Sequence, residues 1–296
     1  MTNTSRKSIL WALRIGLIIN LVLTLIKLIF GYWGHAQALI SDGYNSASDL
    51  LISVMLLFVL KIATKKPDSD HPYGHEKFEG LAYFVLGLVF LGTSIYIGIE
   101  AIIHIIHHIQ IPEDAIKPHL VTVAISIIAL VIKLVLFLYY KSIGKKYNSP
   151  TIKADAKNHQ IDVYATSFSV IGLGIAQLGL VVFDDIAAFI IGLFILRLAI
   201  TILREAISFL TDQAPSFDEI NHIKSFIHSI NGVLKVDDLK VRKHMTQRYV
   251  DVEIGVLANM SLEEAHRIAE DVHHQVEKAF PDVIHCMVHV NPKQKT

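Results

Sequence analysis

The sequence Ser41-Asp42-Gly43-Tyr44-Asn45-Ser46-Ala47-Ser48-Asp49-Leu50 lies inside an apolar run that extends from 36 to 62. Asp42, Asn45 and Asp49 are three and four residues apart, so a helix carries all three on one face. An ionisable group inside a membrane-spanning helix costs about 2.5–3.5 kcal/mol, so each one requires a function. The segment therefore predicts a membrane helix that carries a polar functional site.

Five further runs have a similar character. A bilayer core about 30 Å thick needs roughly 20 apolar residues per helix. Six segments reach this length, at 9–30, 36–62, 80–106, 118–141, 152–180 and 184–209. The 296 residues are 52% hydrophobic and 18% charged, with a mean hydropathy of +0.47, whereas soluble proteins carry about a quarter charged residues. We expect an α-helical membrane protein with six transmembrane helices.

The basic residues of the short loops indicate the orientation of these helices. They gather at the N-terminus and in the second and fourth loops, at Arg6, Lys7, Lys61, Lys65, Lys66, Lys77, Lys141, Lys145 and Lys146. Both termini are therefore predicted to be cytoplasmic, in a bacterial inner or plasma membrane. The first run is long enough to span and Gly31-Tyr32-Trp33-Gly34-His35 is not a cleavage site, so we interpret it as a retained helix.

The composition excludes several functions. Lys and Arg number 27, as do Asp and Glu, so no net basic field indicates nucleic acid as a partner. Cys286 is the only cysteine, which excludes an intrachain disulfide and a thiolate zinc cluster. His104-Ile105-Ile106-His107-His108 matches the H-x-x-H-H box of membrane di-iron enzymes, but those need several boxes on one membrane face. We expect a protein that is not an enzyme, with these histidines at the outer mouth or the interface.

After residue 210 the periodicity changes to that of a small soluble domain. Residues 216–230 and 261–280 have capped amphipathic helical patterns, while 233–241, 249–257 and 283–290 alternate like strands. The expected domains are 1–210, for transport, and 211–296, a cytoplasmic α+β domain of order αββαβ, ferredoxin- or metallochaperone-like.

Two helices each carry an Asn-x-x-x-Asp pair, Asn45 with Asp49 and Asn158 with Asp162. Four oxygen donors on facing helices can surround one divalent cation, and two carboxylates offset its charge. The alternative is that these residues only join helices by hydrogen bonds. Asp42, Asp155 and His159 lie beside this set and are expected to support it.

Further metal ligands are predicted outside the membrane. Asp68, His71 and His75 form a carboxylate–imidazole set in the loop before residue 77, with a solvated polar loop as the alternative. In the tail, Glu253, His266, His285 and His289 lie on separate elements that folding could bring together, although each could also be a surface residue. His285 and His289 are four apart on a strand and therefore share a face.

Taken together, these motifs resemble the cation diffusion facilitator family. The resemblance rests on 41–50, on His71-Pro72-Tyr73-Gly74-His75-Glu76-Lys77-Phe78-Glu79 and on Lys153-Ala154-Asp155-Ala156-Lys157-Asn158-His159-Gln160-Ile161-Asp162, and it covers nearly the whole chain. It implies a homodimer that exports divalent metal in exchange for protons. It also implies that Lys77 and Asp212 join the membrane halves. A dimer-bridging metal cluster in the tail is implied at Asp237, Glu253, His266, His289 and Asn291.

The departures from the family pattern concern the transported ion. Asn45 and Asn158 stand where zinc members usually carry imidazole or carboxylate ligands, and an all-oxygen site favours harder ions. We expect a metal–proton antiporter for Mn²⁺ or Fe²⁺, with Zn²⁺ kept open because a small rotation would bring in His159. Asn158→His is expected to shift transport towards zinc. The alternative functions are a passive divalent cation channel and a membrane-anchored metal sensor.

Overall fold

The computed structural model describes residues 3–63, 65, 68–72, 74–75, 77–146, 150–244 and 247–294. The chain divides into two compact units. The first comprises 1–60 and 85–203, and the second comprises 61–84 and 204–296.

Long helices correspond to the six apolar runs. They are α1 (Asn3–Trp33), α2 (Gln37–Ala63), α3 (Lys77–Gln110), α4 (Leu120–Lys146), α5 (Pro150–Gln177) and α6 (Val182–Leu210), with a short 3₁₀ helix, η1, at Pro112–Asp114. Among the described residues, four segments are long and apolar enough to cross a membrane: Leu13–Trp33, α3, α4 and α6. The membrane-helical character is confirmed, while the number of spans stays a prediction. α2 and α5 carry the charged and amide residues of the predicted site, which lower their hydropathy. Lys66 and the side chains of Arg6 and Lys7 lie outside the described residues.

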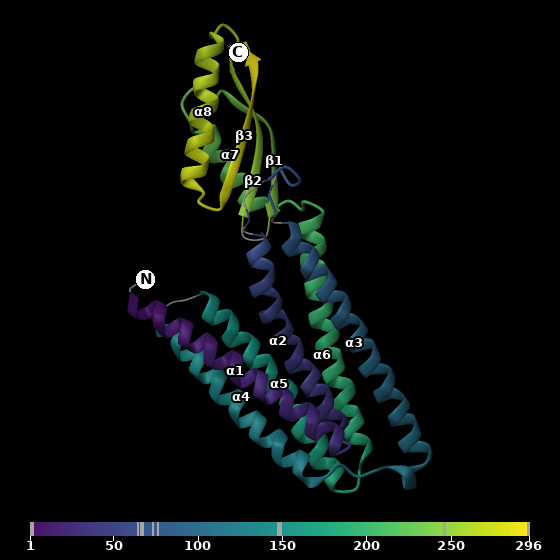
Figure 1. Ribbon diagram of the computed structural model, residues 1–296. Helices are drawn as coiled ribbons and strands as arrows, with labels where there is room; N and C mark the ends of the chain where they lie inside the picture. Colours follow the sequence, from purple (N-terminus) through teal and green to yellow (C-terminus); the bar gives the residue numbers. More distant parts are fainter. Residues whose placement is uncertain are drawn as a thin grey trace. The chain divides into compact units, whose positions relative to one another are not determined.

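The helices of the first unit pack through small residues. In Figure 1, α4 runs beside α1 and α5. α5 also meets α6 closely, since a Cβ on Gly172 would lie 2.4 Å from the Cβ of Ala187. Large apolar side chains on α3 and α4, such as Val89 and Val135, are instead half exposed. This outward apolar surface is what a lipid-facing bundle requires.

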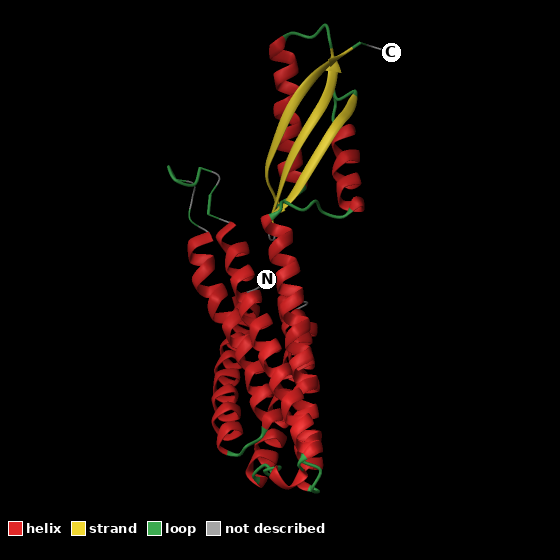
Figure 2. Cartoon of the chain, turned by 90° about the vertical axis from the view of Figure 1, so that its right-hand side faces the viewer, coloured by secondary structure: helices red, strands yellow, loops and turns green. Residues whose placement is uncertain are grey.

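The second unit contains the predicted α+β domain. Its elements are α7 (Phe217–His228), β1 (Lys235–His244), β2 (Gln247–Leu257), α8 (Leu262–Ala279) and β3 (Val283–Lys293), so the order αββαβ is confirmed. Figure 2 shows the three strands side by side with both helices against them. β1 pairs with β2 in antiparallel fashion, and β2 pairs with β3 in parallel.

One hydrophobic core holds this domain together. Alternate residues of β2, from Val250 to Val256, are buried against Ile223 of α7 and Val272 of α8. Ser216 and Ser261 begin the two helices, each in a reciprocal capping box with the glutamate three residues later. The opposite face of the sheet remains available for polar groups.

Candidate metal centre

The predicted polar residues of α2 and α5 meet inside the first unit. Asn45 Nδ2 donates to Asp162 Oδ1 over 3.2 Å, and both side chains are buried. The carboxyl group of Asp49 lies within hydrogen-bonding reach of Asp162. Two carboxylates so close together repel each other, and a shared proton or a nearby cation relieves this repulsion. The structure thus brings Asn45, Asp49 and Asp162 into one centre.

Two buried lysines complete this centre. Lys133 Nζ lies 2.6 Å from Asp162 Oδ2 and donates to Asn20 Oδ1 over 3.0 Å. Lys27 Nζ lies 2.7 Å from Asp42 Oδ2, and Thr166 Oγ1 donates to the other oxygen of Asp42 over 3.1 Å. Neither lysine side chain has any exposed surface. Each ammonium therefore neutralises a carboxylate that would otherwise be buried alone.

Sequence reasoning missed these lysines, although a signal was present. Lys27 and Lys133 lie inside the apolar runs 9–30 and 118–141, where a lysine is as costly as an aspartate. Applying the same argument to cations would have identified both. Their partners could not be deduced, because the pairing depends on which helix faces meet.

The fifth helix presents His159 to the centre. His159 is buried, its Nδ1 lies 3.7 Å from Asp162 Oδ2, and its ring packs edge-on against Tyr140. Asn158 is exposed, so the structure does not bring it together with Asn45 and Asp162. Asp155, one turn before His159, is half-buried.

The loop residues also come together. Asp68 lies 3.6 Å from His71 Nδ1 and 3.3 Å from His75 Nε2, through different carboxylate oxygens. One ligand atom from each residue lies within 4.8 Å of the other two. The backbone N–H of His71 donates to Asp68 and holds the pKa of that carboxyl below its usual range. A charged carboxylate beside two imidazoles suits a borderline divalent ion.

Lys77 and Asp212 form the ion pair that the family resemblance implies. Their Nζ and Oδ2 atoms are 3.3 Å apart. Both residues belong to the second unit; Lys77 is exposed and Asp212 is half-buried, so solvent reaches this contact and weakens it.

The tail residues divide into separate groups. Asn291 Nδ2 donates to Asp237 and to Glu253, each over 3.2 Å, and His289 pairs with Glu253 in the strand register. Lys293 Nζ lies 3.0 Å from Asp237, and this hydrogen bond lowers the pKa of that carboxyl. Lys293 thus occupies the position beside Asp237 that a bound metal cation would take.

His266 and His285 lie apart from this group. The side chain of His266 is 72% exposed and faces Glu270 on its own helix. His285 joins His273 and Glu277, whose ligand atoms lie within 4.8 Å of one another. His273 Nδ1 and Glu277 also bond the backbone of Cys286. This trio was not predicted, because local sequence does not show which faces of α8 and β3 meet.

Comparison with known proteins identifies the family. The sequence model described as the cation efflux transmembrane domain matches residues 13–211, and the one described as the cation efflux protein cytoplasmic domain matches 215–293. The chain belongs to the cation efflux family. The resemblance inferred from its motifs is thereby confirmed, and the chain is a divalent metal efflux transporter rather than an enzyme.

Several relatives of this cation efflux protein extend over nearly its whole length. The manganese efflux system protein MneP of Bacillus subtilis (strain 168) is 30% identical over 285 residues, which cover 94% of each chain. An uncharacterized transporter of Methanocaldococcus jannaschii is 33% identical, covering 92% of this chain and 94% of the relative. Among solved structures, the putative zinc transporter CzrB is 28% identical with a TM-score of 0.26, covering 27% of this chain and 98% of that one.

Proposed function

We propose that this transporter exports Mn²⁺ or Fe²⁺ in exchange for protons at the centre formed by Asn45, Asp49 and Asp162. The contact between the Asp49 and Asp162 carboxyl groups supports the exchange most directly. Either a proton or a divalent cation can relieve the repulsion between the two carboxylates. Binding of one prevents binding of the other. Alternating access of such a buried site to the two faces makes the transport coupled.

The ligand chemistry supports manganese or iron as the substrate. Asn45, Asp49 and Asp162 offer only oxygen atoms, which harder divalent ions accept readily. Two relatives are named as manganese efflux proteins, MneP and MneS of Bacillus subtilis. The buried imidazole of His159 supports some zinc transport as well, because zinc prefers nitrogen ligands.

The architecture of the transporter is proposed as follows. Residues 1–210 form the transport domain, which spans a bacterial inner or plasma membrane six times. Both termini of the chain lie in the cytoplasm. Residues 211–296 form a cytoplasmic domain that joins two copies of the chain and responds to metal. The loop set of Asp68, His71 and His75 is proposed as a second metal site, supported by the proximity of its ligand atoms.

Proteoliposomes that contain a pH-sensitive dye test the transport mechanism. We expect added Mn²⁺ to enter the vesicles in exchange for protons that leave the lumen. Asp49→Asn should abolish both the metal uptake and the pH change. Glu205→Gln, a change of an exposed carboxylate on α6, serves as the control and should leave both signals unchanged. Metal flux that neither alters nor responds to a pH gradient would indicate a passive channel. Metal binding without flux would indicate a sensor.

A further inference from the structure

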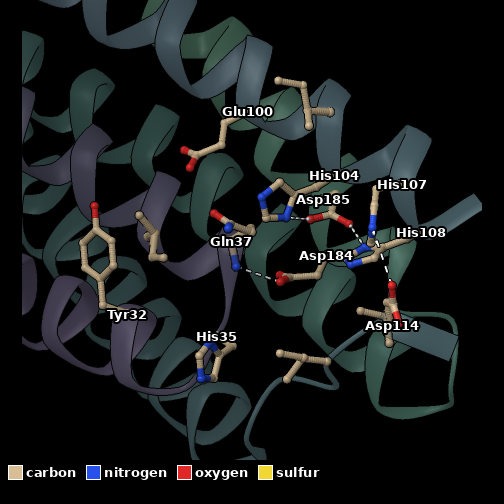
Figure 3. A pocket seen from close by; sticks show the side chains of 14 residues that line it. Tyr32, His35, Gln37, Glu100, His104, His107, His108, Asp114, Asp184 and Asp185 are labelled. Carbon is tan, nitrogen blue, oxygen red and sulfur yellow. Dashed lines mark hydrogen bonds and ion pairs between the residues drawn. The ribbon is translucent and has the colours of Figure 1, made fainter. Parts of the chain in front are cut away.

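A cavity of about 470 Å³ lies at the end of the first unit where α1 and α3 end and where α2 and α6 begin. One side of it is polar (Figure 3). The ionisable residues there are Glu100, His104, His107 and His108 of α3, Asp184 and Asp185 of α6, and Tyr32, His35 and Asp114. This set lies outside the centre formed by Asp49 and Asp162.

The two aspartates of this cavity have different partners. Asp184 accepts hydrogen bonds from the backbone N–H groups of Gln37 and Ala38, over 2.7 and 3.0 Å. It therefore caps the N-terminus of α2, which is a structural role. Asp185 faces α3 instead and is almost completely buried.

Asp185 lies between two imidazoles. One of its oxygens lies 2.7 Å from His108 Nδ1, and the other lies 3.7 Å from His104 Nδ1. His108 presents Nδ1 to the carboxylate at hydrogen-bond distance, so when that nitrogen carries the proton of the neutral ring the lone pair falls on Nε2. His104 Nδ1 faces the same carboxylate at a distance too long for a hydrogen bond. A carboxylate that holds one ring nitrogen while the other binds a metal is the usual support for a histidine ligand.

The spacing of the two histidines suits a shared ion. His104 and His108 are four residues apart on one helical face, and their ring centres are 5.8 Å apart. Two rings at this separation can coordinate one ion when each metal–nitrogen bond is about 2.1 Å long. In Figure 3 the second ring nitrogen of His104 points away from Asp185 and into the cavity. Glu100, one turn earlier on α3, adds a carboxylate to the same lining.

A few residues line both this cavity and a separate small space nearer the transport centre. A second, smaller space of about 10 Å³ shares Gln37, Ile40 and Glu100 with it and reaches Tyr44. Tyr44 immediately precedes Asn45 of the centre. At 1.5 Å per residue, Asn45 lies about 12 Å along α2 from Gln37.

We propose that His104 and His108 bind a divalent cation through Nε2, with Asp185 as the positioning residue that holds His108 and lies beside His104. This site receives the ion after it leaves Asp49 and Asp162. That role as a release site rests on the proposed function, whereas the binding itself does not.

Zinc binding to the purified full-length protein tests the site. Equilibrium dialysis is performed on Asp49→Asn/Asp162→Asn, whose transport centre is disabled. We expect the further change His104→Gln/His108→Gln to remove one bound Zn²⁺ per chain, while His119→Gln removes none. His119 is the matched control because it lies at the same end of the unit but stacks on Trp33 outside the cavity. Equal zinc stoichiometry in the double-histidine variant and its background would overturn the proposal.

The role of Asp185 has its own readout. Asp185→Asn preserves the shape of the side chain and is expected to weaken zinc binding at this site by about 10- to 100-fold without removing it. An unchanged affinity would show that Asp185 does not support the ligands.

A measurement on the unaltered protein avoids any loss of folding in the variants. Diethyl pyrocarbonate modifies accessible imidazoles, and mass spectrometry reports each residue separately. Zn²⁺ should protect His104 and His108 but leave the modification of His119 unchanged, and equal modification with and without zinc would overturn the proposal. If zinc protects His104 and His108 in a protein that shows no metal flux, the proposed transport function is refuted and the metal site is not.

Discussion

Lys133 shows how a single residue sets the electrostatics of the transport centre. Its ammonium group lies in the middle of an otherwise apolar helix and contacts Asp162 at 2.6 Å. A divalent ion at Asp162 must compete with this ammonium. The lysine therefore both stabilises the metal-free centre and limits its affinity for metal.

Replacement of Lys133 tests this competition. Lys133→Gln leaves Asp162 buried without its ion-pair partner, so we expect a loss of about 3–5 kcal/mol in the free energy of unfolding. Mn²⁺ should then raise the melting temperature of the variant more than that of the unaltered protein. Lys145→Gln, an exposed change on the same helix, should stay within about 0.5 kcal/mol. Equal stability of the Lys133 variant and the parent protein would contradict this account.

Asn158 and His159 are alternative ligands of the proposed centre, and each predicts a different ion selectivity. If Asn158 is the ligand, Asn158→His increases zinc transport and His159→Ala has little effect. The buried ring of His159, 3.7 Å from Asp162, favours the other register. We therefore expect His159→Ala to reduce Zn²⁺ flux more than Mn²⁺ flux in proteoliposomes, and Asn158→Ala to change neither. If Asn158→Ala abolished all flux and His159→Ala left the flux unchanged, Asn158 would be the ligand.

At the level of elements, close helix packing holds the carboxylates in place. Asp162 reaches the centre from α5, and α5 is positioned by its contact with α6 near Gly172. Only a residue without a side chain fits there, since an added Cβ would also lie 2.7 Å from the backbone oxygen of Phe183. A displacement of α5 at Gly172 is expected to move Asp162, which lies on the same helix.

A pair of glycine substitutions tests this packing. Gly172→Ala forces α5 away from α6, and overpacking of this kind costs about 1–3 kcal/mol. Gly174→Ala, two residues along the same helix, meets no atom within 4 Å and is the control. We expect a lower melting temperature and slower Mn²⁺ flux for the first variant only. The same behaviour in both would show that the close approach is unimportant.

At the level of the whole molecule, the tail is a unit with its own hydrophobic core. Its polar group of Asp237, Glu253 and Asn291 lies on the sheet, where Lys293 already neutralises Asp237. Metal binding at this group must displace Lys293. The proposed response of the tail to metal therefore depends on a lysine as well as on the ligands.

The isolated fragment 211–296 tests dimerisation and metal response together. We expect a dimer by sedimentation that binds Zn²⁺ or Mn²⁺ at micromolar concentration, and tighter binding in Lys293→Ala because the competing ammonium is gone. Lys240→Ala removes an exposed lysine that pairs with Asp238 and should leave the affinity unchanged. A fragment that stays monomeric and free of metal would refute both proposals for the tail.

The sequence alone determined the membrane helices, the αββαβ tail and its helix caps, because apolar periodicity and capping residues act over only a few positions. It also located Asp49 and Asp162, whose cost inside an apolar run marks them without knowledge of the fold. The tertiary structure decided what these residues meet: Lys133 beside Asp162, His159 rather than Asn158 turned inwards, and His285 with His273 rather than with His289. These contacts join residues far apart in the chain or depend on the rotation of one helix, and local pattern carries no information about either.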